Sequence, residues 1–353
     1  MKHVLISFLL ISACTEAFSQ NLITVGILPD LNTDYSSIQA AIDAASPGDI
    51  IQITPGVYSE TGVTIDKELY IQGSGFNIVG NFSTNGILTG SAFLNSAVSI
   101  TADGSNSIIE SLDIHRLDVT DAVDILIRRS RIRHATIANM AGEFQGCYMG
   151  GSQFSLEDAQ FLLSGNINIT YSNCLFPDVR SIASSGRASI FDPWIHQTTP
   201  SGQINFDRCI FRNLLHGTLS NVIVIVENSI FLTNDARIAA TNGNGSIVVN
   251  SLFEIGASND ASATHNIFSI NGANELNGYP NSTPSFDAQF MLSSSSQAIG
   301  YANDGGDCGI FGGLNPYILS GIPSIPFIYN FDANLQGSTG GGLDVNIQVR
   351  SQN

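Results

Sequence analysis

The sequence of 353 residues carries little charge and almost no lysine. Asp, Glu, Lys and Arg together make up 12% of the chain, and its only lysines are Lys2 and Lys67. Glycine, serine, asparagine and isoleucine are abundant instead, and such a composition suits short strands joined by tight turns. The composition therefore argues against long, charged surface helices and favours an all-β protein.

The charge that is present is mostly negative. The formal net charge is −17 at pH 7, and the acidic residues are spread along the chain. Such a surface repels phosphate backbones, which argues against nucleic acid as a partner. An acidic polysaccharide would be repelled in the same way, unless arginines or bound cations reverse the field locally.

Cysteine is too scarce to build the fold. Beyond Cys14, the thiols are Cys147, Cys174, Cys209 and Cys308, which are too few for a disulfide scaffold in a chain of this length. No CxxC motif or paired Cys/His spacing predicts a zinc site. The sequence therefore predicts no cofactor, apart from a calcium candidate near the C-terminus.

The only extended apolar run follows Met1-Lys2-His3 and reads VLISFLLISA. It is too short to span a membrane and has the form of an export signal. Cleavage after Ser19 predicts a signal peptide over residues 1–19 and a secreted or cell-surface protein without a transmembrane span. The alternative is the lipobox-like ISAC, which would anchor the protein through a lipid on Cys14.

A single short helix is predicted near the start, over about residues 36–46. Ser36 and Gln39 fit a capping box, apolar residues share one face, and Pro47-Gly48 ends the helix. The following segments, DIIQITPGVY and TGVTIDKELYIQGSG, read as strands. One helix before a long series of strands is typical of a β-solenoid whose open hydrophobic end is covered by that helix.

A degenerate strand ending recurs along the rest of the chain. Its large apolar residues are Ile132, Phe161, Phe176, Phe211, Phe231, Phe253 and Phe268. Strand alternation points the residue two positions earlier inward as well, and these are Ser130, Ala159, Cys174, Cys209, Ser229, Ser251 and Asn266. The pattern predicts a core of stacked large side chains beside stacked small ones, with Cys174 and Cys209 as interior thiols. A disulfide between neighbouring coils stays open at this point.

Two segments carry a family resemblance. DYSSIQAAIDAASPGDIIQITPGVYSETGVTIDKELYIQGSG resembles the N-terminal coil of the pectate-lyase-like superfamily, which includes pectin methylesterases. FDAQFMLSSSSQAIGYANDGGDCGIFGG resembles the last coil of secreted β-helix repeat proteins. The resemblance implies a right-handed, single-stranded parallel β-helix over residues 20–313. Residues 314–353 would form a short β-rich appendage, in which GLDVNIQVRS reads as a strand.

The catalytic motifs of these families are absent. Pectin methylesterases carry GFxAQD-like and GxVDFIFG-like motifs, and polygalacturonases carry an Asp-Asp pair and a GHG; none of these is present. The WxDH-like segment of classical pectate lyases is missing too, and a lysine base could only be Lys67. The resemblance therefore implies a fold and leaves the function open.

The densest polar segment is DIHRLDVTDAVDILIRRSRIRH, and it holds five candidate residues: Asp113, His115, Arg129, Arg131 and Arg133. Aligning its two strands sets Asp113 against Arg131 and His115 against Arg133, all pointing outward. The three arginines would then form a row that binds a uronate or sulfated sugar, with Asp113 and His115 as base and acid. The other interpretation is a ladder of ion pairs on a solvated face.

Two long spacings predict loops that leave the solenoid. The first loop carries Tyr148, and the second carries Asp192, Trp194 and His196 at alternate positions. Tyr148 and Trp194 could form a platform for sugar rings, with the other two residues supplying hydrogen bonds or acid–base groups. Alternatively, the second loop packs on itself and buries Trp194 over the coil.

The calcium candidate is NDGGD, in which Asp304 and Asp307 could act as ligands. The same residues are also common in a plain turn.

Together these observations favour a monomeric, exported, non-catalytic module that binds glycan or packs against cell-envelope components. The alternative is a polysaccharide-active lyase or hydrolase that uses the arginine row or the Asp192–His196 loop. A third reading is a purely structural spacer.

Overall fold

The computed structural model describes residues 20–28, 32–76, 90–150, 161–177, 200–212, 221–232, 247–254, 263–280, 287–324, 326–333 and 345–350. The predicted signal peptide, Ala159 and the loop with Asp192, Trp194 and His196 lie outside these residues. In the described helices, no segment is long and apolar enough to cross a membrane.

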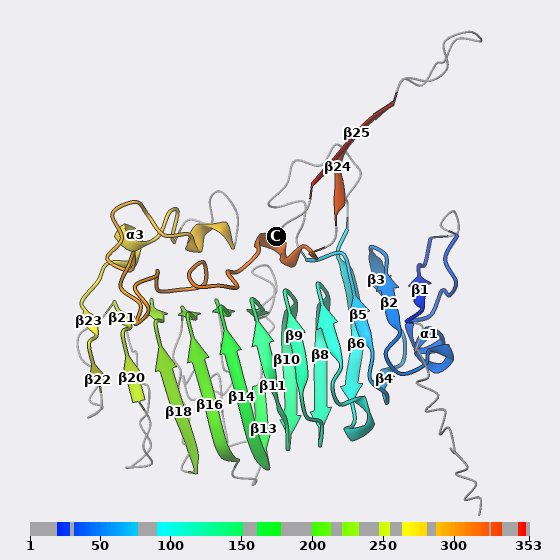
Figure 1. The fold of residues 1–353 in the computed structure, drawn as a ribbon, viewed down its shortest axis with the longest axis horizontal. Coiled ribbons are helices and arrows are strands. Elements are labelled where there is room, and N and C mark those ends of the chain that lie inside the picture. Colours follow the sequence, from blue (N-terminus) through cyan, green and yellow to red (C-terminus); the bar gives the residue numbers. More distant parts are fainter. Residues whose placement is uncertain are drawn as a thin grey trace, which may run out of the picture.

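Two long sheets make up the body of the protein (Figure 1). Sheet A contains, in order, β1 (Leu22–Val25), β2 (Ile50–Ile53), β5 (Tyr70–Gln72), β7 (Ile108–Glu110), β9 (Ile125–Arg128), β11 (Ala141–Gln145), β14 (Asn166–Ser172), β16 (Ser201–Asp207), β18 (Val222–Glu227), β20 (Ile247–Val249) and β22 (Ala263–Thr264). Sheet B contains, in order, β3 (Gly56–Tyr58), β6 (Ala92–Ile100), β8 (Asp113–Thr120), β10 (Arg131–Ala138), β12 (Tyr148–Met149), β15 (Leu175–Phe176), β17 (Ile210–Phe211), β19 (Ile230–Phe231), β21 (Leu252–Phe253) and β23 (Ile267–Phe268).

Two further strands join sheet B: β4 (Val63–Ile65) pairs with β6, and β13 (Phe161–Ser164) pairs with β10. All pairs in both sheets are parallel, and the chain alternates between the sheets as it advances. The protein is therefore a parallel β-helix, which confirms the predicted fold class.

From β7 onward, the chain turns from sheet A to sheet B through one residue with left-handed backbone. We call these residues the corner column: Ser111, Arg129, Gly146, Asn173, Arg208, Asn228, Asn250 and His265, all with φ between 50° and 60°. Asn and Gly tolerate this conformation better than most residues, which explains their frequency here. Because the turn takes a single residue, the alternation of inward-pointing and outward-pointing side chains begins again directly after it on sheet B.

The interior contains the two predicted columns. Phe176, Phe211, Phe231 and Phe253 are buried and stacked, with ring centroids 4.9, 4.7 and 4.6 Å apart in that order. The small column beside them contains Ser130, Cys147, Cys174, Cys209, Ser229 and Ser251, all with no exposed surface.

One coil of the predicted register is wrong. Met149, not Phe161, lies beside Ile132, and Tyr148 pairs with Leu175, so Met149 precedes Phe176 in the large column. Phe161 instead begins β13 and pairs with Ala135. The 15 residues from Phe161 to Phe176 are only part of a coil, because β13 pairs with the later half of β10, whereas β15 pairs with β12.

The three interior thiols are hydrogen-bonded and unpaired. Each sulfur donates to a carbonyl of the preceding coil: Cys147 to Ile127 at 3.3 Å, Cys174 to Phe144 at 3.2 Å and Cys209 to Tyr171 at 3.4 Å. The four described cysteines are free and buried. The open possibility of a disulfide between coils is thus resolved in favour of stacked thiols.

A second hydrophobic core lies outside the solenoid. In each coil, the residue between the small and the large interior residue in the sequence points outward from sheet B. These outward residues are apolar and buried: Tyr148, Leu175, Ile210, Ile230 and Leu252. They pack with Leu276, Phe290, Ile310 and Tyr317, which follow the last strands of the solenoid. This part of the chain includes α3 (Gly272–Glu275) and the short 3-10 helices Ala288–Phe290 and Leu319–Gly321.

Residues 298–322, which we call the strap, run back along the ends of the sheet A strands (Figure 1). The strap follows the corner column: the Tyr301 hydroxyl donates to the His265 carbonyl, and the Phe76 amide donates to the Ser320 carbonyl. At Gly309, where φ is +83°, a Cβ atom would lie 2.8 Å from Ile230, so only glycine allows this close approach. The strap covers the apolar outer column over several coils.

Helix α1 spans Ile38–Ala44, with Ile38, Ala41 and Ile42 buried. Its N-cap is Ser37, one residue after the predicted Ser36, and Glu60 accepts hydrogen bonds from the amides of Ile38 and Gln39. The predicted capping box is therefore wrong, because the residue three positions after the cap is Ala40, and the Gln39 side chain accepts from the Thr64 amide at 2.7 Å instead. Covering of the solenoid end by α1 stays a prediction.

The predicted C-terminal strand is β25 (Val345–Arg350), which pairs antiparallel with β24 (Phe327–Ala333). In Figure 1 this hairpin projects away from the solenoid.

Candidate functional site

The predicted pairing of Asp113 with Arg131 is present between β8 and β10. The Asp113 carboxylate accepts two hydrogen bonds from Arg133, from Nε at 3.1 Å and from Nη2 at 3.0 Å. The Arg131 Nη1 atom lies 3.6 Å from the same carboxylate. Asp113 is only 4% exposed and Arg131 only 8%, so this is a buried ion-pair network and not a solvated face.

Aromatic rings cover both of these guanidinium groups. Arg131 lies over the Tyr148 ring at 5.4 Å, and Arg133 lies over the Phe93 ring at 4.2 Å. Arg131 also donates to the Gly150 carbonyl at 3.5 Å. These contacts stabilise the cations in place and use the donors that a bound uronate would need.

Arg129 does not continue the predicted row. It belongs to the corner column, and its left-handed backbone interrupts strand alternation, so its side chain turns toward sheet A. There Arg129 Nη1 lies 3.3 Å and Arg128 Nη2 3.0 Å from the Glu110 carboxylate, which has no exposed surface. The Tyr70 hydroxyl also donates to Glu110; burial first, and then this hydrogen bond, raise the pKa of Tyr70.

His115 lies beside His134, with ring centroids 5.3 Å apart in an edge-to-face arrangement. Arg116 next to them is half-exposed and donates from Nε to both oxygens of Asp118, at 2.9 and 3.0 Å. The predicted acid–base pair would need a free Asp113 carboxylate, but Arg133 occupies both of its oxygens. The arrangement can bind an anion weakly at Arg116, but it does not leave the Asp113 carboxylate available as a base for His115.

Tyr148 is not on a projecting loop. It lies in β12, is 3% exposed, and its ring lies 6.0 Å from that of Phe76. The first predicted loop therefore does not supply a sugar platform through Tyr148. The second half of that platform, Trp194 with Asp192 and His196, lies outside the described residues.

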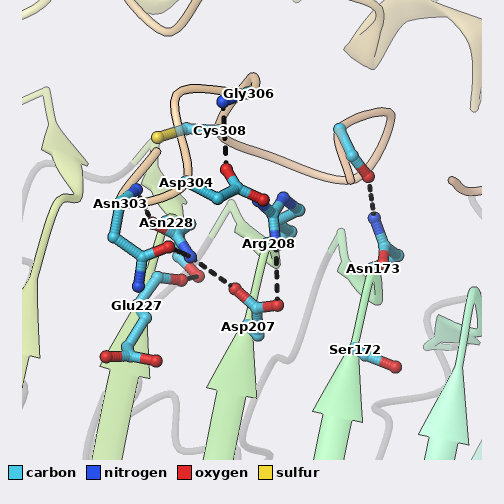
Figure 2. Close-up of polar contacts among 12 residues, drawn as sticks. Ser172, Asn173, Asp207, Arg208, Glu227, Asn228, Asn303, Asp304, Gly306 and Cys308 are labelled. Atoms are coloured by element: carbon cyan, nitrogen blue, oxygen red, sulfur yellow. Dashed lines mark hydrogen bonds and ion pairs between the residues drawn. The ribbon is translucent and has the colours of Figure 1, made fainter. Parts of the chain in front are cut away.

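The Asp304 carboxylate connects the strap to Arg208 of the corner column (Figure 2), and the Asp307 carboxylate forms a contact within the strap. Asp304 pairs with Arg208 and accepts from the Gly306 amide at 3.0 Å; the amide first, and then Arg208, lower the pKa of Asp304. Asp307 accepts from the Gly300 amide at 2.9 Å. Over the described ranges no three His, Cys, Asp or Glu side chains gather as a metal site. The turn interpretation fits these contacts.

Sequence reasoning missed a set of polar rows on the outer face of sheet A. Strand register sets Asn168 beside Gln203, Glu143 beside Thr170 and Asn205, and Gln145 beside Ser172, Asp207 and Glu227. The signal is the alternation in NINITYS and QINFD, where every second residue is buried. Because neighbouring strands lie about 4.8 Å apart, each row presents a polar group at that repeat.

These side chains interact along and across the rows. Gln203 Nε2 donates to Asn205 Oδ1 at 2.7 Å, Asn205 Nδ2 donates to Thr170 Oγ1 at 3.3 Å, and Ser172 donates to Glu143. Figure 2 shows Asp207 contacting Arg208 and Asn228, whereas the Glu227 carboxylate points away from the strap. The face is half-buried, pre-organised and rich in donors and acceptors.

No protein-family model matches the sequence, and no curated protein is significantly similar to it. Among solved structures, pectate lyase Pel9A is similar over 81% of this chain and 92% of its own, at 14% identity and a TM-score of 0.47. A pectin methylesterase from Aspergillus niger matches over 78% of this chain and 90% of its own, at 14% identity and a TM-score of 0.22. At 14% identity and with TM-scores below 0.5, neither likeness says anything about the activity of this chain.

Proposed function

We propose that the protein is an exported β-helix module that binds polysaccharide without cleaving it. The observation that carries this proposal is the set of polar rows, in register over β11, β14, β16 and β18. Glycan recognition needs many hydrogen-bonding groups at fixed positions on a rigid surface, because each sugar hydroxyl must exchange its water contacts for protein contacts.

The absence of turnover is inferred from the candidate catalytic residues. Asp113 is engaged by Arg133 and Arg131, and Arg129 is engaged by Glu110, so neither the carboxylate nor these cations are free for a reacting sugar. General acid–base catalysis needs a group that can accept or release a proton within hydrogen-bond reach of the substrate. No role for calcium is included in the proposal.

The test uses purified residues 20–353 with a panel of neutral and acidic polysaccharides, in calcium and in chelator. Affinity electrophoresis measures binding, while assays for reducing ends and unsaturated products measure cleavage. We expect retardation by polysaccharide without product. Product that is lost in His115→Ala would instead establish a lyase or hydrolase, and no retardation with no product would leave a structural envelope module.

The exported location is part of the proposal and has its own test. Mass spectrometry of the protein recovered from the source cell distinguishes a free N-terminus after Ser19 from a lipid on Cys14. We expect cleavage after Ser19. An intact leader would contradict export.

A further inference from the structure

We propose that the outer face of sheet A, from β11 to β18, binds a neutral, hydroxyl-rich glycan chain that runs across the strands. This inference rests on the proposed function and adds the location and the chemical class of the ligand. A chain in this direction meets polar side chains of all three rows on β14 and β16, and the row from Gln145 to Glu227 is polar on all four strands, since the rows lie perpendicular to the strands.

The charge of this face selects against acidic glycans. Asp207 is paired with Arg208 at the corner, but Glu143 and Glu227 also point outward, and none of these four strands contains a lysine, arginine or histidine. A uronate or sulfate on the ligand would face the carboxylates of Glu143 and Glu227, whose strands carry no cation to offset them. Neutral sugar hydroxyls donate to carboxylates, and hydrogen bonds to charged acceptors are the stronger kind.

The amides supply the complementary contacts. Asn168, Gln203 and Asn205 each carry an amide donor and acceptor, and the hydrogen-bonding capacity that the Gln203–Asn205 and Asn205–Thr170 contacts leave over can bind sugar hydroxyls. Gln203 and Asn205 are already ordered by their mutual hydrogen bond at 2.7 Å. Little side-chain entropy is then lost on binding.

The rows end on an apolar border. Gln203 pairs with Ile223, Asn205 with Ile225 and Ile225 with Ile247, and the exposed fractions of Ile223 and Ile247 are 38% and 40%. Sugar rings present C–H faces as well as hydroxyl edges, and exposed aliphatic groups beside polar ones match that pairing. A highly charged polysaccharide would gain no binding free energy from these exposed isoleucines.

The two clusters with arginine on these coils are engaged by the protein's own side chains, so they offer little to an acidic glycan. Arg131 and Arg133 are covered by Tyr148 and Phe93, and Arg128 and Arg129 are both paired with Glu110. The protein therefore differs in expected ligand from an enzyme that acts on acidic pectin.

The test is affinity electrophoresis of residues 20–353 through gels containing hydroxyethyl cellulose, galactomannan, polygalacturonate or alginate. Wild type should be retarded by at least one neutral polymer and by neither acidic one. The double variant Gln203→Ala/Asn205→Ala should weaken that binding at least tenfold. Thr120→Ala, an exposed outward hydroxyl on β8 of the other sheet, is the matched control and should bind like wild type.

The outcomes separate the two proposals. Retardation by no polymer would overturn the proposed function itself. Retardation by an acidic polymer alone, or neutral binding that the double variant retains, would overturn only this inference. If the double variant melts early, carbodiimide footprinting of wild type gives a second readout, in which the neutral polymer should protect Glu143 and Glu227; unchanged labelling would contradict the site.

Discussion

Glu110 shows how this chain uses its few charges. Its carboxylate is fully buried and contacts Arg128, Arg129 and the Tyr70 hydroxyl. A buried ion takes its stability from its partners, and removing one member leaves the others desolvated and unpaired. The network fixes the corner between sheet A and sheet B at these coils.

We therefore expect Glu110→Gln to lower the free energy of unfolding by about 3–5 kcal/mol, since two arginines lose their buried counterion. The measurement is chemical denaturation followed by circular dichroism. Asp118→Asn is the control, because its Arg116 partner is half-exposed and such pairs contribute about 0–1 kcal/mol. Equal losses in both variants would contradict the assigned network.

The buried thiols should make the free energy of unfolding fall at alkaline pH. Burial raises the pKa of Cys174 and of Cys209, and burial raises the pKa of Cys308 to about 12. In the unfolded chain a thiol titrates near about pH 8.5, so above that pH the unfolded state loses protons that the folded state keeps. The stabilising contribution is complete below this pH and is lost as the pH rises toward the folded pKa values.

The free energy of unfolding should accordingly fall between pH 8 and pH 10, and urea melts at half-unit intervals would measure it. Cys174→Ser, which keeps a small hydroxyl donor in the column, should reduce the slope. A thiol reagent at pH 8 should label native protein slowly and unfolded protein fully. A flat profile, or rapid labelling of the folded chain, would show that the thiols are not sealed in the core.

At the scale of elements, the strap and the corner column stabilise each other. Asn173 has a φ of 53°, is buried, and donates from Nδ2 to the carbonyls of Ile310 and Gly312 at 2.9 and 2.8 Å. The side chain thus satisfies carbonyls of a segment that forms no sheet of its own. Asparagine serves both needs, since it tolerates left-handed backbone and offers two donors.

Asn173→Gly should loosen the strap without straining the turn, because glycine keeps the backbone conformation and removes only the two hydrogen bonds. We expect a loss of about 1–3 kcal/mol in local stability, at about 0.5–1.5 kcal/mol per bond. Hydrogen exchange at the amides of Cys308 and Tyr317 measures it. Asn139→Gly, at a left-handed corner on another side of the coil, should leave these amides unchanged; equal acceleration would refute the strap contact.

At the scale of the whole molecule, the local repeat of the sequence predicted the solenoid. It did not predict which side chains would be buried by segments distant in the sequence. Phe211, Phe231 and Phe253 repeat with a small residue two positions earlier, and that pattern alone places both inside. The same pattern did not distinguish Met149 from Phe161, because coil lengths vary. Asp113 beside Arg131 was predictable from alignment of two strands, whereas their burial by Tyr148 was not.

The burial of the outer apolar column could have been predicted from the sequence. Leu175, Ile210, Ile230 and Leu252 point outward by alternation, and an apolar residue at an outward position in successive coils implies a cover. The sequence does not say which distant segment supplies that cover, since the strap follows no repeat. The polar rows on sheet A were equally readable in NINITYS, but only the register across β14 to β18 turns them into a surface.

If the strap is part of one cooperative unit, Ile210 and Ile223 should respond differently to the same truncation. Both are isoleucines that point outward from sheets, but Ile210 is fully buried under the strap and Ile223 is 38% exposed. Ile210→Ala should lower the free energy of unfolding by about 2–5 kcal/mol, whereas Ile223→Ala should change it by less than about 0.5 kcal/mol.

The measurement is thermal and urea unfolding of both variants, with the melting of the strap followed by hydrogen exchange at Cys308. In Ile210→Ala the strap and the solenoid should still unfold in one transition, because the outer column is shared between them. A separate early transition of the strap would mean that it is a docked accessory, and equal stability of the two variants would mean that it does not cover Ile210 in solution.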